Sequence, residues 1–351
     1  MTKLTLSDLQ KLPKVELHGH IDGYLSPQDI LRIAKKHKRQ IVTPDGGVLR
    51  TKNQLIDFWK GNGYDTFLSQ ILSRLYPVTR LMQSEETIKD AALAYVERLS
   101  AERITYAEGR FAPQYHTREG LTMSEAVDSM LQGLKQGEEI HGVKTNLIVC
   151  IGREVTSEVG QEIARVALDF AGRGVVALDL ACDEKDFPPE RHLPAFQMTF
   201  DSNLRRTVHA GEGCLDREQN LRNIRTAVEL LRADGLGHAI HLPHSDSLLH
   251  EVQRKGIRVE SNPVSNVRLG YISSVRELQI DRLLREEVLI SINSDDPAVW
   301  NQGSLAENLY AVAEAYDFVI DDVKKLILNG VRSAFISDKE KGQFAEAFSG
   351  C

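Results

Sequence analysis

Eight short apolar segments that alternate with longer amphipathic ones are the feature that most limits how this chain can fold. The predicted strands span residues 15–20, 105–112, 144–151, 175–181, 206–210, 237–241, 257–262 and 288–293. Segments of helical periodicity, mostly long enough for the crossovers that parallel strands require, lie between them and include 124–142, 161–172, 222–233 and 278–285. Eight such units in series predict an α/β fold, namely a (β/α)8 TIM barrel.

The barrel prediction makes residues 1–351 a single domain, although a chain of 351 residues also has the length of two ordinary domains. After the first predicted strand come three segments of helical periodicity with no strand between them, at 55–59, 67–82 and 85–102. We therefore expect a helical insertion at about residues 26–102. The alternative fold is a doubly wound open sheet, which is less favoured because no glycine-rich phosphate loop follows the first strand.

The insertion begins with a clear helix start. Ser26 is the expected N-cap and Pro27 the first helical residue. The basic run at 35–39 fits the solvated end of that helix, and 43–47 has turn chemistry. Three aromatic residues of the insertion either belong to a lid or pocket wall or simply pack between helices: Phe58, Trp59 and Phe67.

The composition indicates a globular protein with a small-molecule ligand. Apolar residues make up 42% and charged residues 26% of the chain. The net charge of -7 argues against a nucleic-acid partner, because such proteins usually carry a basic surface. The first residues lack an apolar signal-peptide core, and no apolar run has the length of a membrane span. We expect a cytoplasmic protein without a membrane partner; the sequence does not fix its oligomeric state.

The four cysteines are widely spaced and include no Cys-x-x-Cys pair. They are therefore interpreted as reduced thiols and not as a disulfide framework or a thiolate zinc site: Cys150, Cys182, Cys214 and Cys351. A metal ion in this protein would need histidine and carboxylate ligands.

Two histidines lie two residues apart in the first predicted strand. His18 and His20 share one face of an extended strand, so they form half of a potential transition-metal site. The pair alone also fits the solvated face of a strand. In a TIM barrel, however, active-site residues lie at the carboxyl ends of the strands. Further metal-competent or acidic residues lie in or just after later strands: His209, Glu212, His238, Asp295 and Asp296.

The motifs that contain these residues resemble those of the adenosine deaminase family of metal-dependent amidohydrolases. The main matches are 13–23 (PKVELHGHIDG), 208–212 (VHAGE), 237–239 (GHA) and 294–297 (SDDP). Supporting matches occur at 108–113 (EGRFAP), 178–184 (LDLACDE), 263–266 (PVSN) and 333–335 (SAF). All of them follow the family's order along the chain, and together they are far more specific than any one alone.

The resemblance implies one zinc ion per chain and a role for each residue. The metal ligands of the family match His18, His20, His209 and Asp295. His238 matches the base that orients and deprotonates a water molecule, and Glu212 matches the acid that faces purine N1. Asp296 matches the partner of N7. Because adjacent residues of a strand face opposite ways, the chain must turn between Asp295 and Asp296.

The resemblance also implies the reaction, which is hydrolytic deamination of adenosine and 2'-deoxyadenosine to the corresponding inosines with release of ammonia. Asp22 matches a residue that reaches the ribose hydroxyls, and Cys182 stands where a glycine N–H usually approaches purine N3. The chain departs from the family pattern at four positions near the expected ligand: Tyr24, Ala112, Cys182 and Asn262.

Two alternatives to this reaction stay open. The first is a related 6-aminopurine hydrolase that acts on adenine, N6-methyl-AMP or aminodeoxyfutalosine. The second is a non-catalytic purine-binding or adhesion protein on the same barrel. Arg110 and Arg268 are candidates to meet a phosphate, although structural or solvent-exposed roles are favoured for both.

Overall fold

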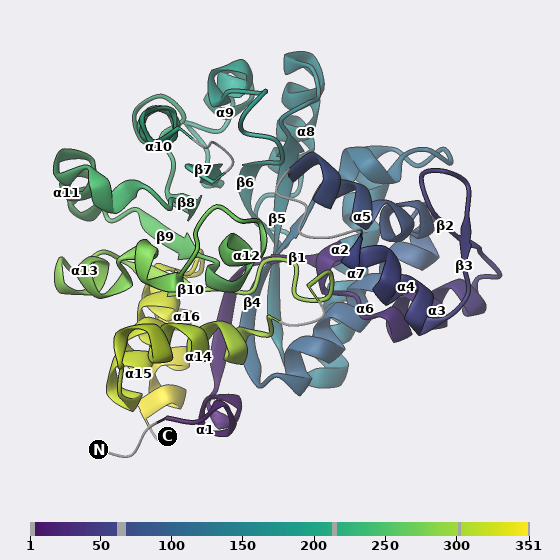
Figure 1. The fold of residues 1–351 in the computed structure, drawn as a ribbon. Helices are drawn as coiled ribbons and strands as arrows, with labels where there is room; N and C mark the ends of the chain where they lie inside the picture. The colour runs from purple at the N-terminus through teal and green to yellow at the C-terminus, as the bar shows by residue number, and fades with distance from the viewer. Residues whose placement is uncertain (1–3, 62–67, 213–215, 301–302, 350–351) are drawn as a thin grey trace.

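A closed ring of eight parallel strands forms the centre of the computed structural model (Figure 1), which describes residues 4–61, 68–212, 216–300 and 303–349. Each strand pairs with the next one of the ring in chain order: β1 (Lys14–His20), β4 (Ile104–Phe111), β5 (Lys144–Gly152), β6 (Val175–Ala181), β7 (Arg205–Ala210), β8 (Gly235–His238), β9 (Arg258–Ser261) and β10 (Ile290–Ile292). All seven of these pairings are parallel.

The ring closes between β1 and the residues that follow β10. The His20 amide donates to the Asp295 carbonyl over 3.1 Å, and the Asp295 amide donates to the His18 carbonyl over 3.0 Å. In addition, the Leu17 amide donates to Asn293 Oδ1 over 3.0 Å. These bonds confirm the predicted TIM barrel and exclude the open doubly wound sheet, because an open sheet would leave β1 or β10 at an edge.

The first strand stops at His20, as predicted, and Ile21–Tyr24 form the short helix α2, so Asp22 lies on a helical turn. Another strand end differs from the prediction. The predicted strand 237–241 instead spans Gly235–His238. It ends there because His238 and Ala239 adopt φ values of +61° and +47°, which leave the extended region.

Helices cover the outside of the barrel, as Figure 1 shows. After β4 they are α7 (Met123–His141), α8 (Ser157–Asp169), α9 (Leu193–Gln197), α10 (Arg217–Glu229), α11 (Asp246–Lys255), α12 (Pro263–Arg268), α13 (Ile280–Arg285), α14 (Leu305–Tyr316), α15 (Ile320–Ser333) and α16 (Asp338–Ser349). Helix α1 (Leu6–Lys11) precedes β1. Within the described part of the chain, no helix is long and apolar enough to cross a membrane.

The segment between β1 and β4 is mainly helical, with α3 (Pro27–Lys36), α4 (Lys52–Lys60), α5 (Leu68–Leu81) and α6 (Glu85–Ala101). Ser26 caps α3 as predicted, because its side chain accepts from the Asp29 amide. The predicted turn joins a hairpin that the sequence did not indicate, β2 (Ile41–Val42) and β3 (Val48–Leu49). Strands of two residues are too short to show a period of two.

Of the three aromatic residues singled out in this segment, Trp59 packs in the core and Phe58 is partly buried. The Trp59 indole N–H donates to the Arg74 carbonyl over 3.1 Å. Phe67 lies outside the described residues. Helix packing therefore accounts for Trp59, and whether this segment moves as a lid stays a prediction, as does the assignment of the whole chain to one domain.

The inside of the barrel holds a fully buried ion network. Arg110 pairs with Asp179, with 3.1 Å between Nε and Oδ2, and with Glu260. Arg258 pairs with Glu260 over 2.6 Å and with Glu108 over 2.7 Å. All five side chains are at most 1% exposed. Arg110 is therefore a structural residue, and the suggestion that it meets a phosphate is wrong.

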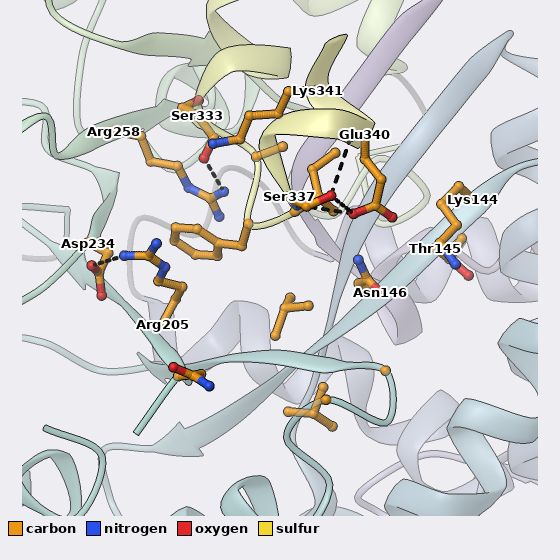
Figure 2. Close-up of a pocket in the computed structure, with 18 of the residues that line it drawn as sticks. Lys144, Thr145, Asn146, Arg205, Asp234, Arg258, Ser333, Ser337, Glu340 and Lys341 are labelled. Carbon is orange, nitrogen blue, oxygen red and sulfur yellow. Dashed lines mark hydrogen bonds and ion pairs between the residues drawn. The ribbon is translucent and has the colours of Figure 1, made fainter. Parts of the chain in front are cut away.

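The network ends at a cavity at the amino ends of the strands, opposite the metal-competent residues (Figure 2). The cavity has a volume of about 1480 Å³. At its floor, Arg258 donates to the Ser333 carbonyl over 3.1 Å, and the guanidinium carbon lies 3.6 Å from the centre of the Phe335 ring. The segment after α15 therefore covers this end of the ion network.

We predict that Arg110→Met destabilises the protein by about 3–5 kcal/mol, because it leaves Asp179 and Glu260 as buried carboxylates without this cation. Urea unfolding followed by circular dichroism measures the change. The matched control is Arg32→Met, since Arg32 also pairs with two carboxylates, Asp29 and Glu97, but its side chain is 53% exposed. That control should lose about 1 kcal/mol or less. Equal losses in the two variants would contradict the prediction.

Candidate metal centre and active site

Five side chains meet at the carboxyl end of the barrel. His18 and His20 come from β1, His209 from β7, His238 from β8, and Asp295 from the segment after β10. The donor atoms of His18, His209, His238 and Asp295 all lie within 4.8 Å of one another. His20 adjoins this group, with its Nε2 atom 3.2 Å from that of His209 and 3.5 Å from Asp295 Oδ1. The structure thus brings together the four predicted ligands and His238.

The tautomers of two histidines favour a cation between them. His18 Nδ1 lies 2.9 Å from Glu260 Oε2, and His209 Nδ1 lies 3.1 Å from Asp179 Oδ2. A carboxylate only accepts, so each Nδ1 atom carries a proton and each Nε2 atom of the neutral ring presents a lone pair. Those two Nε2 atoms are 3.0 Å apart. Lone pairs at this distance repel each other unless a cation lies between them, so the residues fit a metal ion.

The ionisation states of His20, His209 and Asp295 agree with this arrangement, whereas the pKa of His18 is raised, because its contacts with Asp295 and Glu260 outweigh the effect of burial. Burial and the neighbouring imidazoles lower the pKa of His20 to about 3, and burial also lowers the pKa of His209. Burial opposes the ionisation of Asp295, yet contact with His18 and His238 holds the pKa of this carboxyl well below its usual range. Neutral imidazoles and an ionised carboxylate are the forms that bind a metal ion.

The backbone turns at Asp295 as the sequence predicted. Asp295 has a φ of +63°, which leaves the extended conformation of β10 and separates its direction from that of Asp296. Asp296 is packed against Gly23, where an added Cβ would lie 1.7 Å from Asp296 Oδ1. Burial and the neighbouring Asp295 and Asp22 raise the pKa of Asp296 well above its usual range. Glycine at position 23 is therefore required for the position of this carboxyl.

Glu212 is held beside His238 by a second glutamate. The amides of Gly211 and Glu212 donate to the two carboxylate oxygens of Glu184 over 2.7 and 2.8 Å. Glu212 Oε2 lies 3.4 Å from His238 Nε2. Burial, with the charges of Asp295 and Glu184, raises the pKa of Glu212 well above its usual range. A carboxyl group that stays protonated near neutral pH can act as a proton donor.

A pocket opens from this cluster. Besides His20, His209, Glu212, Asp295 and Asp296, its lining includes Asp22, Leu75, Ala112, Tyr115, Cys182, Leu269 and Trp300. Leu75 belongs to α5, so the segment between β1 and β4 does supply part of the pocket wall. The described lining contains no lysine or arginine, and Arg268 is not part of it. Residues 62–67, 213–215 and 301–302 have no lysine or arginine in their sequence either.

The four unusual positions have different surroundings. Cys182 lines the pocket, and its φ of +77° is the left-handed conformation in which glycine is common. Its Sγ atom lies 3.4 Å from the Tyr115 hydroxyl. Ala112 also lines the pocket. Asn262 instead lies behind His238, with its amide nitrogen 3.3 Å from Nε2.

Tyr24, like Asn262, is absent from the described lining of the pocket. Its side chain is fully buried, and its hydroxyl contacts Glu16 and Ser294. The expectation that Tyr24 shapes the space for the ligand is therefore wrong. Of the four cysteines, Cys150 and Cys182 are free as predicted, whereas Cys214 and Cys351 lie outside the described residues.

No role was predicted for the residues that hold the site from behind, although three of them lie in the motifs at 178–184 and 263–266. These are Glu260 and Asp179, which contact the metal-competent histidines, Glu184, and Asn266, whose amide nitrogen lies 2.8 Å from His238 Nδ1. A signal was available for the first two. Charged residues inside strands predicted to be buried on both faces require partners, and the strand ends beside them carry histidines.

Comparison with known proteins agrees with this geometry. The family model described as adenosine deaminase matches residues 13–349. The adenosine deaminase of Clostridium kluyveri is 33% identical, over 97% of this chain and 94% of that protein. The crystal structure of adenine deaminase from Arthrobacter aurescens has a TM-score of 0.84 and 25% identity, over 97% of this chain and 98% of that one.

A third similar protein is an amidohydrolase of Burkholderia ambifaria solved with bound zinc. It has a TM-score of 0.84 and 22% identity, and the match covers 99% of this chain and 93% of that chain. At this identity the similarity concerns the fold. The match of the family model to nearly the whole chain, together with the relative at 33% identity, carries the assignment: this chain is an aminohydrolase that belongs to the adenosine deaminase family.

Proposed function

We propose that this protein is a zinc-dependent enzyme that deaminates adenosine and 2'-deoxyadenosine to inosine and 2'-deoxyinosine, with release of ammonia. The observation that carries the proposal is the convergence of four metal-competent side chains beside a buried carboxyl of raised pKa, Glu212, and a buried imidazole. The adenosine deaminase of Clostridium kluyveri supports the same substrate class.

Zinc is the proposed ion because its catalytic sites commonly use histidine nitrogens and one carboxylate oxygen, which match His18, His20, His209 and Asp295. The amidohydrolase of Burkholderia ambifaria contains zinc in a barrel of the same fold. A zinc ion in this position would lower the pKa of a water molecule toward neutrality.

The protein side chains would then move protons between water and purine. Burial lowers the pKa of His238 far below its usual range, so this neutral imidazole can accept a proton from the attacking water. Glu212 would donate its proton to N1 as the water oxygen attacks C6. The C6–N bond then breaks: His238 would return its proton to the amine, which leaves as ammonia, and the C6 hydroxyl proton would pass to Glu212, which leaves the 6-oxo purine and restores both side chains. Asp296 would pair with N7.

The pocket favours a neutral substrate over a phosphorylated one. A phosphate group would need cationic or multiple N–H partners, and the described lining offers neither lysine nor arginine. N6-methyl-AMP is therefore less favoured, and the same argument applies to an anionic 5'-extension such as that of aminodeoxyfutalosine. Adenine is the second candidate, because the adenine deaminase of Arthrobacter aurescens has the same fold at 25% identity. Asp22, at the pocket wall, is the residue proposed to bind ribose hydroxyls.

Glu212→Gln is expected to lower kcat for adenosine by about 10²–10⁴-fold, because glutamine cannot transfer a proton to N1. Zinc content and melting temperature should stay close to those of the unmodified protein. Release of ammonia from adenosine is measured to follow the reaction. Glu97→Gln, on the protein surface, is the control. Unchanged activity in Glu212→Gln would disprove the assigned role.

Removal of zinc with a chelator is expected to abolish activity and lower the melting temperature. The ion binds only the folded site and stabilises it by about 2.7 kcal/mol at 100 times its dissociation constant. Calorimetry of the apo protein and of the zinc-reloaded protein measures the effect. Identical melting temperatures together with full activity in the apo protein would contradict a metal-dependent mechanism.

A substrate panel separates the candidates. Ammonia release is measured for adenosine, 2'-deoxyadenosine, adenine, AMP, aminodeoxyfutalosine and N6-methyl-AMP, with methylamine followed for the last. We expect the two nucleosides to have the highest kcat/KM. Asp22→Asn should raise KM for adenosine about 10-fold and leave any adenine turnover unchanged, because only the nucleoside has ribose hydroxyls.

The panel also has outcomes that overturn the proposal. Fastest turnover of adenine would establish the second candidate. No turnover of any compound by zinc-loaded protein would favour the non-catalytic purine-binding protein instead.

A further inference from the structure

Tyr24 takes no part in the proposed chemistry, yet it lies directly behind the metal-competent residues. Its side chain is fully buried on α2, the helical turn that follows His20. The ring packs edge-on against Tyr95, with ring centres 5.0 Å apart. Its hydroxyl lies 3.0 Å from Glu16 Oε2 and 2.6 Å from Ser294 Oγ. Tyr24 therefore contacts both chain segments that meet where the barrel closes.

Glu16 is the residue through which these contacts reach the metal centre. Its Oε1 atom accepts from the His18 amide over 2.9 Å. Its Oε2 atom accepts from the Ser294 amide over 3.0 Å, from the Ser294 hydroxyl, and from the Tyr24 hydroxyl. One fully buried carboxylate thus fixes the backbone at a proposed ligand, His18, and the backbone next to another, Asp295.

The backbone at Asp295 needs such support. Its φ of +63° is unfavourable for a residue with a side chain and persists only where the surroundings hold it. Bonds to β1 hold this residue on one side, and the bonds of the Ser294 amide and hydroxyl to Glu16, with the Tyr24 hydroxyl in contact with both side chains, hold the residue before it. A displacement of Ser294 would therefore move the Asp295 carboxylate relative to His18 and His20.

The tyrosine ring also explains the glycine between the two histidines. A Cβ atom at Gly19 would lie 2.7 Å from Tyr24 Cε2, so the ring occupies the space that a side chain at position 19 would need. The ring therefore packs against the backbone at Gly19, which links His18 to His20. The ring contact with Gly19 and the hydroxyl contact with Glu16 thus both hold Tyr24 against β1.

We propose that Tyr24 is a positioning residue of the metal centre: its hydroxyl holds Glu16 and Ser294 together and so keeps Asp295 within reach of the ion that His18 and His20 bind. The inference rests on the proposed function in one respect, namely that this centre binds zinc. It assigns to Tyr24 a role in metal affinity and none in substrate binding.

The test compares two buried tyrosines, of which only Tyr24 has hydrogen-bond partners for its hydroxyl among the described residues. Tyr24→Phe removes a hydroxyl with two partners. Tyr95→Phe removes a buried hydroxyl from the packed neighbour, for which the described residues offer no hydrogen-bond partner. Zinc affinity is measured by competition with a chromophoric chelator in the absence of substrate, and the melting temperature of each apo protein is recorded. Cobalt replaces zinc in a parallel set, so that the visible spectrum reports ligand geometry.

We expect Tyr24→Phe to weaken zinc binding about 10-fold and to alter the cobalt spectrum, because groups that orient metal ligands usually contribute 10–100-fold to affinity. Tyr95→Phe should keep zinc affinity within about twofold and an unchanged spectrum. If Tyr24→Phe fails to fold, Ser294→Ala removes the contact of the Tyr24 hydroxyl with Ser294 together with the bond of the Ser294 hydroxyl to Glu16, and it should weaken zinc binding at least as much.

The outcomes distinguish this inference from the proposed function. Zinc affinity and cobalt spectra that are the same in the unmodified protein and in Tyr24→Phe would overturn the inference alone. Equal weakening in Tyr24→Phe and Tyr95→Phe would also overturn it, because the effect would then come from packing. If the unmodified protein binds no zinc, the proposed function fails as well.

Discussion

The carboxylate of Glu260 is the group on which both the barrel interior and the metal centre depend. Its two oxygens pair with Arg110 and Arg258 inside the barrel, and Oε2 also accepts from His18 Nδ1. The two arginines hold the pKa of this carboxyl below its usual range although burial acts in the opposite direction. Because Glu260 stays ionised, it fixes the His18 tautomer whose Nε2 atom can bind a metal ion.

Such a network is not an efficient way to stabilise a fold. Burial of two arginines and three carboxylates costs several kcal/mol per ion, and a well-packed apolar interior often does equally well. The network has a different effect here, because Asp179 does for His209 what Glu260 does for His18. The Phe335 ring and the Ser333 carbonyl cover the Arg258 end. The interior of this barrel is therefore best understood as support for the metal-competent histidines.

The sequence predicted the barrel and the residues at its rim because both leave a local signal. Apolar strands of fixed length reveal the fold, and histidines at strand ends reveal the site. Partnerships between distant strands leave no such signal: nothing near Glu260 in the sequence indicates Arg110, 150 residues away. The direction of a single side chain is equally hidden. Tyr24 points away from the pocket because it lies on the helical turn α2, which the sequence did not indicate, and such a turn changes the direction of each side chain.

Backbone conformation shows how the barrel supports its site. Of the non-glycine residues described with positive φ, six lie in turns next to helix ends, where this conformation is common: Lys38, Arg103, Arg232, Gln279, Glu287 and Asp317. The other four lie at the carboxyl ends of strands around the site: Cys182, His238, Ala239 and Asp295. A positive φ at a non-glycine residue costs on the order of 1–3 kcal/mol of folding free energy, so it is kept only where the surrounding structure holds the backbone in place. At Asp295 these surroundings are the closure bonds to β1, so the contact that completes the barrel is also the one that turns a carboxylate toward the histidines.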